Sequence, residues 1–451
     1  MRLAGNRMRS LVALVTVLGL ALTGYLTDVG PKVLAVAGAT DSGPAAVSVF
    51  DGFIPRREQA AIRAGTSRYD ATADIQRAVA AVSGTGKALQ FPAGTYLVGQ
   101  VVFSGHDYTV ETAGVTFRQR PGLTGDGNVH PIITFPPGSA KIRLGDVRLV
   151  GNIATDRDEY SHGIAVISAK NITIGNVAGE NIRGDVLYTY GRTSSEAEYQ
   201  RNLVTGTIRG KNIYRCIVAM AGGQARIAGI VQEGPVGYRD LDIEPNAGGA
   251  YQPVEAVIGP VRGSTVQITS ADEKLVNASV TIESLDLDGD RIADTMPSYP
   301  RHPGRGAFAL SIDHVDTVKI GLLRLRNYDG RPVQLDGKWR SISIGTLDFA
   351  RSDTRDPTYK AIVFQHGAAG AGVLSIDRIV GEAAGPDRFV LRSDRGLLKV
   401  DVGSVDVDGG KFGAYLTGRV REIAKPGENN REDVCPLGCR DLRIDEVAPA
   451  P

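Results

Sequence analysis

Hydrophobic positions near the start of the chain repeat with the period of a helix. Ile75, Val79 and Val82 fall at i, i+4 and i+7, which places them on one apolar stripe of an amphipathic helix. Thr72 stands where an N-cap residue would, and Asp74 follows in the first turn, where a negative charge is favourable. We therefore predict a helix that is capped by Thr72 and buries this stripe.

Further along the chain, segments that alternate apolar and polar residues recur. Segments 172–181 and 203–212 share two glycines and a final asparagine at a constant offset, and segment 318–327 keeps the first glycine and the asparagine. Weaker copies begin at Ile342, Leu374 and Val400. Each copy alternates like a strand with one face inward and is too short to bury that face alone. The copies must therefore stack.

Stacked copies of this kind favour one fold over its rivals. A propeller needs a longer and more regular period, and a sandwich pairs its strands by hairpins, whereas strand-Gly-strand copies are more naturally parallel. We predict an all-β fold, a right-handed parallel β-helix (a solenoid), with the N-terminal amphipathic helix capping the exposed end of its first coil. Asn181, Asn212 and Asn327 are expected to stack as an inward ladder of amides.

Two motifs near the predicted cap resemble a known superfamily. The pattern D-x-T-x-x-I-Q-x-A runs from Asp70 to Ala78, and F-P-A-G-T-Y, which predicts strand, turn and strand, runs from Phe91 to Tyr96. Together they resemble the start of the pectate-lyase superfamily, which includes polygalacturonase-like hydrolases and phage tailspike depolymerases. The resemblance covers residues 53–102. It implies a parallel β-helix that acts on polysaccharides.

The same resemblance extends weakly to two later segments. G-D-V-L-Y at 184–188 is similar to a G-D-G-I-Y stretch common in these proteins, and D-I-E-P-N at 242–246 resembles a segment at the groove of tailspike-like hydrolases. The N-x-D with paired aspartates, G-H-G and R-I-K elements of typical polygalacturonases are missing from the sequence. Classical pectin hydrolysis is therefore not implied.

Composition limits the classes of molecule that the protein is expected to bind. The 451 residues are 42% hydrophobic and 22% charged, enough for a large core, and the 56 glycines are spread as if between many short strands. Lys and Arg total 51 against 50 Asp and Glu, so no global field attracts nucleic acid or an anionic membrane. We expect a polysaccharide partner and no nucleic acid. The sequence does not indicate an oligomeric state.

The N-terminus carries an export-like segment. Arg2, Arg7 and Arg9 precede the uncharged run 11–22, the layout of a secretory signal, with an uncleaved membrane anchor as the rival interpretation. We expect a secreted, periplasmic or cell-surface protein that contacts a membrane only if this segment is retained. The predicted organisation is signal or anchor plus linker at 1–37, N-terminal segment and cap at 38–105, β-helix at 106–425, and tail at 426–451.

Three carboxylates fall in one predicted strand. Alternation turns Leu241 and Ile243 inward and groups Asp240, Asp242 and Glu244 on one outer face. Same-face neighbours lie about 6.6 Å apart along a strand and coils about 4.8 Å apart, so a carboxylate pair suits either separation used by glycosidases. Mutual repulsion should raise at least one pKa, as a general acid requires. The alternative is an ordinary polar face neutralised by Arg or Lys on adjacent coils.

Asp185 lies about two coils before these acids, beside two tyrosines. Pyranose faces stack on aromatic rings while carboxylates bind hydroxyls or move protons, so this combination suits a sugar site. The alternative is that the tyrosines cover apolar surface. The candidate substrate-binding residues are Arg183, Tyr188, Tyr190, Lys211 and His162. Glu159 and Tyr160 precede His162 in a segment expected to wall the same groove.

Three functional hypotheses follow. The first is an exported polysaccharide-degrading glycoside hydrolase, with an acid among Asp240, Asp242 and Glu244 as proton donor and Asp185 as partner carboxylate. The second is a polysaccharide lyase acting on a uronate polymer, in which Lys211 and its neighbours Arg183, Tyr188 and Tyr190 would neutralise the uronate and abstract a proton. The third is a non-catalytic β-helix that binds or organises surface polysaccharide.

Metal and disulfide chemistry have weaker signals. Segment 286–294 spaces aspartates like a calcium loop but lacks the glycine and glutamate of an EF-hand, so we expect no cofactor and keep calcium as an alternative. Cys435 and Cys439 are spaced to close a small disulfide loop in an oxidising compartment. Cys216 lies in an apolar run and is expected to be buried.

Overall fold

The computed structural model describes most of the chain from residue 45 onward. The described ranges are 45–122, 130–155, 159–191, 198–245, 253–269, 276–292, 308–328, 332–350, 361–366, 372–382, 389–393, 398–408, 411–412, 416–423 and 442–444. They belong to one compact unit, Pro44–Pro451. The predicted export segment and the Cys435/Cys439 loop lie outside these ranges. Within the ranges, no helix is long and apolar enough to cross a membrane.

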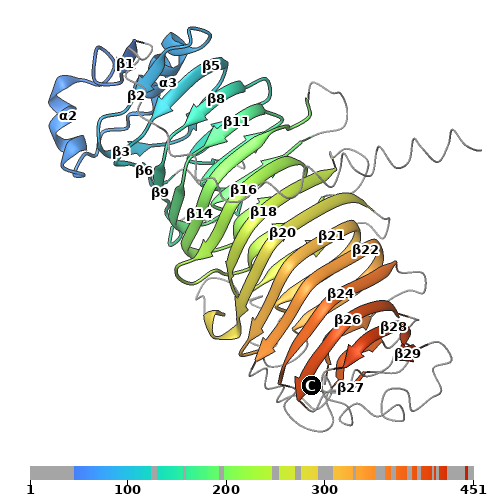
Figure 1. Cartoon of the computed structure of the whole chain (residues 1–451). Coiled ribbons are helices and arrows are strands. Elements are labelled where there is room, and N and C mark those ends of the chain that lie inside the picture. Colours follow the sequence, from blue (N-terminus) through green and yellow to red (C-terminus); the bar gives the residue numbers. More distant parts are fainter. Residues whose placement is uncertain are drawn as a thin grey trace, which may run out of the picture. The chain divides into compact units, whose positions relative to one another are not determined.

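The strands form a right-handed parallel β-helix, as the sequence predicts. Each strand pairs in parallel with the equivalent strand of the next coil, and the coils follow one another in sequence order from blue to red in Figure 1. A coil turns through three successive sheets, which we name the first, second and third faces. Only stacking satisfies the backbone hydrogen-bonding groups of such strands, because each coil alone leaves an unpaired strand edge.

The first face begins with short strands. These are β1 (Ala46–Ser48), β2 (Ala88–Gln90), β5 (His106–Glu111), β8 (Ala140–Leu144) and β11 (Lys170–Ile174). The second face begins with β3 (Gly94–Val98), β6 (Val115–Gln119), β9 (Val147–Val150) and β12 (Val177–Ile182). Pairing of β2 with β5 and of β3 with β6 starts the coil before residue 106.

Later coils carry longer strands that continue from the first face onto the second. These are β14 (Leu203–Ile213), β16 (Gly223–Gln232), β18 (Val254–Gly263), β20 (Val276–Asp288), β24 (Val373–Glu382), β26 (Leu398–Asp408) and β28 (Leu416–Ile423). The short strand β29 (Leu442–Ile444) pairs with β28 on the first face. Two strands run along all three faces, β21 (Leu310–Arg326) and β22 (Val333–Ala350). A short 3-10 helix, η2 (Gly289–Arg291), follows β20.

The third face consists of the remaining strands. They are β4 (Val101–Val102), β7 (Ile133–Phe135), β10 (Ile164–Ile167), β13 (Leu187–Tyr190), β15 (Cys216–Met220), β17 (Arg239–Ile243), β19 (Val266–Thr269), β23 (Ala361–His366), β25 (Phe389–Ser393) and β27 (Lys411–Phe412). This face is the one that carries the carboxylates singled out in the sequence.

The core lies inside the coil. Inward positions such as Ile142, Ile172 and Leu203 stack in register from one coil to the next and are fully buried. One continuous apolar cluster extends in this way from Val49 to Val405. Burying each such side chain contributes about 1.5–3 kcal/mol, so the stack is held mainly by this column. Cys216 belongs to the buried set, as predicted, and is a free thiol.

Two helices, α2 (Arg56–Arg63) and α3 (Thr72–Val82), contact the first coil at the blue end of the stack (Figure 1). Ile75, Val79 and Val82 are buried, which confirms the predicted stripe. The predicted N-cap is wrong: Thr72 is already helical, and its N–H donates to Asp70 Oδ1 at 3.0 Å. Its hydroxyl instead accepts the N–H of Gly99 at 2.7 Å, which ties the helix to the coil.

The asparagine ladder exists, but not as predicted in every detail. Asn212 Nδ2 donates to Asn181 Oδ1 at 2.5 Å, and both residues have the left-handed backbone that asparagine tolerates. Asn327 donates instead to Asp288 Oδ1 at 2.8 Å. The three side chains are half-buried at a corner of the coil rather than pointing inward. The ladder therefore fixes the turn between strands.

Candidate functional site

A small hollow opens on the third face where large side chains flank small ones. Tyr188 of β13, Ala219 of β15 and Asp242 of β17 occupy one register row across three coils. Because the middle coil contributes alanines, the outer two coils wall a cavity of about 200 Å³. Its lining residues are Glu159, Tyr160, Tyr188, Arg215, Ala219, Met220, Ala221, Asp242 and Glu244. Two of the predicted acids and one predicted tyrosine therefore meet here.

Asp242 is the most perturbed carboxyl of the cavity. It is 1% exposed, and Oδ1 has no hydrogen-bond partner among the described residues. Burial raises its pKa from 3.8 to about 7, and the negative charges of Glu244 and Asp185 act in the same direction, while Arg215 opposes them. A carboxyl in this state holds a proton near neutral pH and has an unused oxygen beside the cavity.

Glu244 follows β17 and lines the same cavity two positions later. It is partly exposed, and burial raises its pKa while the positive charge of Arg215 acts to lower it. Alternation along an extended chain places Glu244 on the same side as Asp242, about 6.6–6.8 Å further along. The site therefore pairs a buried acid with a more exposed one, and burial raises the pKa of both against the opposing charge of Arg215.

Asp185 and Arg215 form a buried ion pair behind the cavity. Asp185 is fully buried; its Oδ1 lies 3.7 Å from Arg215 Nε and accepts the N–H of Cys216 at 3.0 Å. Burial acts to raise the pKa of Asp185, but Arg215 and the hydrogen bonds outweigh it and lower the pKa overall. Asp185 in turn raises the pKa of Arg215. Asp185 does not itself line the cavity; it holds the arginine that does.

Asp240 does not share the surface of its two neighbours, contrary to prediction. Its side chain is fully buried, and Oδ2 accepts the backbone N–H groups of Ser264 at 2.5 Å and Thr265 at 2.8 Å. Burial raises its pKa to about 6, and these hydrogen bonds limit the rise. The next coil bends over Asp240, so the carboxyl supports the backbone between β18 and β19 instead of facing solvent.

His162 and the tyrosines form an aromatic stack beside the cavity. The His162 ring lies parallel to Tyr188 at 4.5 Å between centroids, and Tyr188 stacks on Tyr190 at 6.5 Å. The backbone N–H of Asp185 donates to His162 Nδ1 at 3.1 Å. His162 is buried and does not line the cavity, so it orients Tyr188 rather than facing a ligand. Tyr160, 49% exposed, forms the outer wall with Glu159, as the sequence predicts.

The two basic candidates lie elsewhere. The Arg183 guanidinium packs over the ring of Tyr214, 3.3 Å from its centroid. Lys211 lies on the second face, with Nζ 3.9 Å from Glu180 Oε1. Neither residue lines the cavity. The described lining of the cavity therefore contains no lysine.

Arg215 is the charged residue of the cavity lining that the sequence reasoning missed. The repeat contained the signal: the offset of 31 that aligns Asn181 with Asn212 also aligns Gly184 with Arg215 and Asp185 with Cys216. Aligning the copies therefore places Arg215 one coil after Asp185, and this could have been predicted from the sequence.

The calcium-like segment has other partners. Asp286 pairs with Arg326 at 2.5 Å, and Asp288 Oδ1 accepts hydrogen bonds from Asn327 and from the N–H of Asp290. Asp294 lies outside the described ranges. In the part of the chain that the structure describes, no group of three or more His, Cys, Asp or Glu side chains is arranged to hold a metal ion.

The raised pKa of Asp242 predicts a stability that falls with rising pH. Unfolding lowers this pKa from about 7 to 3.8, so the native state binds the proton more tightly than the unfolded state. The stabilisation that proton binding gives the native state is lost as the pH rises from about 4 to 7. The expected loss is up to about 4 kcal/mol. We expect Asp242→Asn to be more stable than wild type at pH 8 and equally stable at pH 3.5, measured by thermal unfolding. An equal difference at both pH values would contradict this origin.

No protein-family model matches the chain, and no curated protein matches it. The fold is similar to that of a family 28 exopolygalacturonase from Yersinia enterocolitica, with 14% sequence identity, a TM-score of 0.45, and coverage of 91% of this chain and 78% of the other.

Proposed function

We propose that the protein is a polysaccharide-degrading enzyme, a glycoside hydrolase whose active site is the third-face cavity. The observation that carries the proposal is the pairing of Asp242, buried with a pKa of about 7, with the more exposed Glu244 in one cavity. Glycosidases commonly use a pair of carboxyl groups that differ in their surroundings, and these two differ in burial.

The two acids would have different roles. Asp242 donates its proton to the glycosidic oxygen as the bond to the anomeric carbon breaks, and Glu244 acts on the other side of that carbon. Glu244 either takes a proton from the water that attacks the carbon or attacks it directly before water completes the reaction. In both cases one water is consumed for each bond cleaved. Tyr188 and Tyr160 offer ring surface for a pyranose.

Arg215 favours hydrolysis over elimination. Asp185 raises the pKa of Arg215, so the guanidinium keeps its proton and is a poor base for abstracting a proton from a uronate. The same charge favours the ionised form of Glu244. Arg215 is therefore suited to hold an ionised carboxylate in place and to bind sugar oxygens. We also propose, from the N-terminal segment alone, that the protein acts outside the cytoplasm.

The test is incubation of the full chain with a panel of neutral and acidic polysaccharides, following reducing ends and the absorbance of unsaturated uronates together. We expect new reducing ends without that absorbance. A rise in both signals would identify a lyase instead. Neither signal on any polymer, with polymer retained by the protein, would identify a non-catalytic binding protein.

A further inference from the structure

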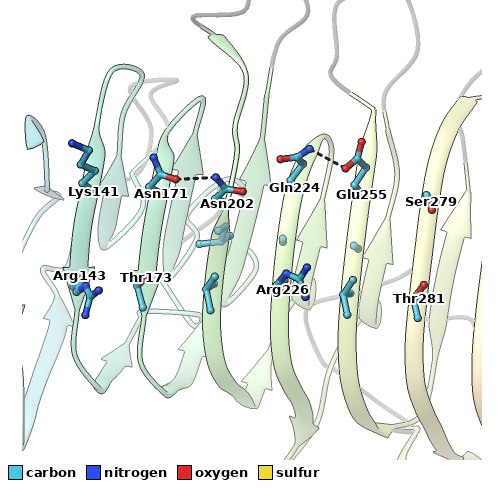
Figure 2. A pocket seen from close by; sticks show the side chains of 15 residues that line it. Lys141, Arg143, Asn171, Thr173, Asn202, Gln224, Arg226, Glu255, Ser279 and Thr281 are labelled. Carbon is cyan, nitrogen blue, oxygen red and sulfur yellow. Dashed lines mark hydrogen bonds between the residues drawn. The ribbon is translucent and has the colours of Figure 1, made fainter. Parts of the chain in front are cut away.

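A second hollow lies on the first face, away from the carboxylate cavity. It has a volume of about 1000 Å³ and crosses β8, β11, β14, β16, β18 and β20. Figure 2 shows its labelled side chains in two rows that run from coil to coil. One row consists of Lys141, Asn171, Asn202, Gln224, Glu255 and Ser279. The other consists of Arg143, Thr173, Val204, Arg226, Val257 and Thr281.

The rows are exposed because of strand alternation. The residues between them, such as Ile142 and Leu203, point into the core, so every second side chain is offered to solvent on consecutive coils. Two hydrogen bonds donated by side-chain amides connect neighbouring coils: Asn202 donates to Asn171 at 2.8 Å, and Gln224 donates to the carboxylate of Glu255 at 2.9 Å (Figure 2). The face is therefore a fixed polar platform rather than a set of independent side chains.

The platform is positively charged. Its lining contains three basic side chains and one carboxylate. Lys141 is partly neutralised by Asp107 at 3.5 Å, whereas no carboxylate of the described residues lies within 4.0 Å of the guanidinium of Arg143 or Arg226. Three coil steps, about 14 Å, separate these two arginines along their row.

We propose that this face binds a stretch of acidic polysaccharide laid along the axis of the β-helix. Arg143 and Arg226 meet its carboxylate or sulfate groups, and the amides of Asn171 and Gln224 hydrogen-bond its hydroxyls. Val204 and Val257, 42% and 45% exposed, offer apolar contact to the sugar rings between the charges. The inference rests on the proposed function only in taking a polysaccharide as the ligand.

Other polymers fit the platform less well. Single-stranded nucleic acid binds through aromatic platforms, and the lining of this hollow contains no aromatic side chain. Protein interfaces concentrate Trp, Tyr and Arg in buried central pockets, whereas the lining here is open, mostly small and amide-rich. A long, regular anion with many hydroxyls matches both the repeat of the rows and their charge.

The test is binding of a fluorescently labelled polyuronate to the full chain carrying Asp242→Asn, so that turnover does not consume the probe. We expect the Arg143→Gln/Arg226→Gln variant to bind about five- to tenfold more weakly, and we expect added salt to weaken binding of the unsubstituted face. The matched control, Arg118→Gln/Arg378→Gln, removes two exposed arginines from the second face and should bind normally. The carboxyl-reduced form of the same polymer should bind weakly to all variants.

Equal binding by the two arginine variants would overturn the proposal, as would equal binding of the reduced polymer. Sedimentation provides a further check: a dimer that dissociates in the Arg143→Gln/Arg226→Gln variant would assign the face to a second copy of the chain and also overturn it. Binding that depends on the first face while no polymer is ever cleaved would uphold this inference and refute the proposed hydrolase. Cleavage of polymer without binding to the first face would refute this inference and uphold the proposed hydrolase.

Discussion

Replacement of Asp242 by asparagine is expected to lower kcat for polysaccharide cleavage by about 100- to 10,000-fold while the coil stays intact. Asparagine has nearly the same shape but no proton to give to the leaving oxygen, and general acid catalysis contributes about this factor. The measurement is the initial rate of reducing-end formation for wild type and variant at the same pH. Circular dichroism shows whether both proteins are folded.

Asp348→Asn is the matched control for this experiment. Asp348 is a partly exposed carboxylate on the second face, paired with Arg324 at 2.9 Å, and it is remote from the cavity in the coil. Its replacement should leave the rate unchanged. If Asp242→Asn kept more than about a tenth of the wild-type rate, Asp242 would not be the proton donor.

Replacement of Arg215 by methionine is expected to lower the free energy of unfolding by about 3–5 kcal/mol. The change leaves the carboxylate of Asp185 fully buried without its cation, and breaking a buried pair from one side has a cost of this size. Chemical denaturation followed by circular dichroism measures the effect. The neighbouring acids then lose a stabilising charge, so cleavage should fall as well.

A double variant separates the ion pair from simple loss of packing. Asp185→Asn together with Arg215→Met removes both charges and should recover a large part of the stability lost in Arg215→Met. Arg324→Met, which breaks an exposed pair with Asp348, should cost less than about 1 kcal/mol. No recovery in the double variant would mean that Arg215 acts through its packing alone.

The architecture was predictable because its causes are local and repeated. Alternation in segments such as 172–181 and 203–212 decides which side chains face the core, and a constant offset decides that the segments stack. The helix stripe at Ile75, Val79 and Val82 was equally readable, since burial of one face requires that spacing. The Thr72 cap failed because the helix already includes Thr72, whose N–H donates to Asp70 Oδ1 and whose hydroxyl accepts the N–H of Gly99 instead of an N–H of its own helix.

The site was predictable only in part, because alternation gives the side of a strand but not what the next coil does there. Asp240 and Asp242 have the same parity, yet the chain at Ser264 covers the first and leaves the second beside a cavity. The position of Lys211 likewise depended on where β14 passes from the first face to the second, because Lys211 lies in the part that pairs with β12 on the second face. Such differences arise at the corners of the coil, where the sequence pattern is irregular.

The acid that we propose as proton donor also weakens the fold. Burial of Asp242 raises its pKa to about 7, and the same burial reduces stability as pH rises toward neutrality. Asp240 Oδ2 accepts hydrogen bonds from the next coil, while Asp240 Oδ1 and Asp242 Oδ1 both have no partner among the described residues. Only Asp242 lines the cavity, so its unpaired oxygen belongs to a carboxyl that a ligand could meet. A buried carboxyl that lines a cavity and lowers the stability of the fold is the pattern expected of a catalytic group.

The most direct test of the central claim is mass spectrometry of the products formed by wild type and Asp242→Asn on the same polysaccharide panel. Hydrolysis adds one water to the polymer for each bond cleaved, whereas elimination adds none. We predict fragments of hydrolytic mass with wild type and almost none with the variant. Fragments with the mass of unsaturated sugars, or equal amounts of product from both proteins, would contradict a hydrolase that depends on Asp242.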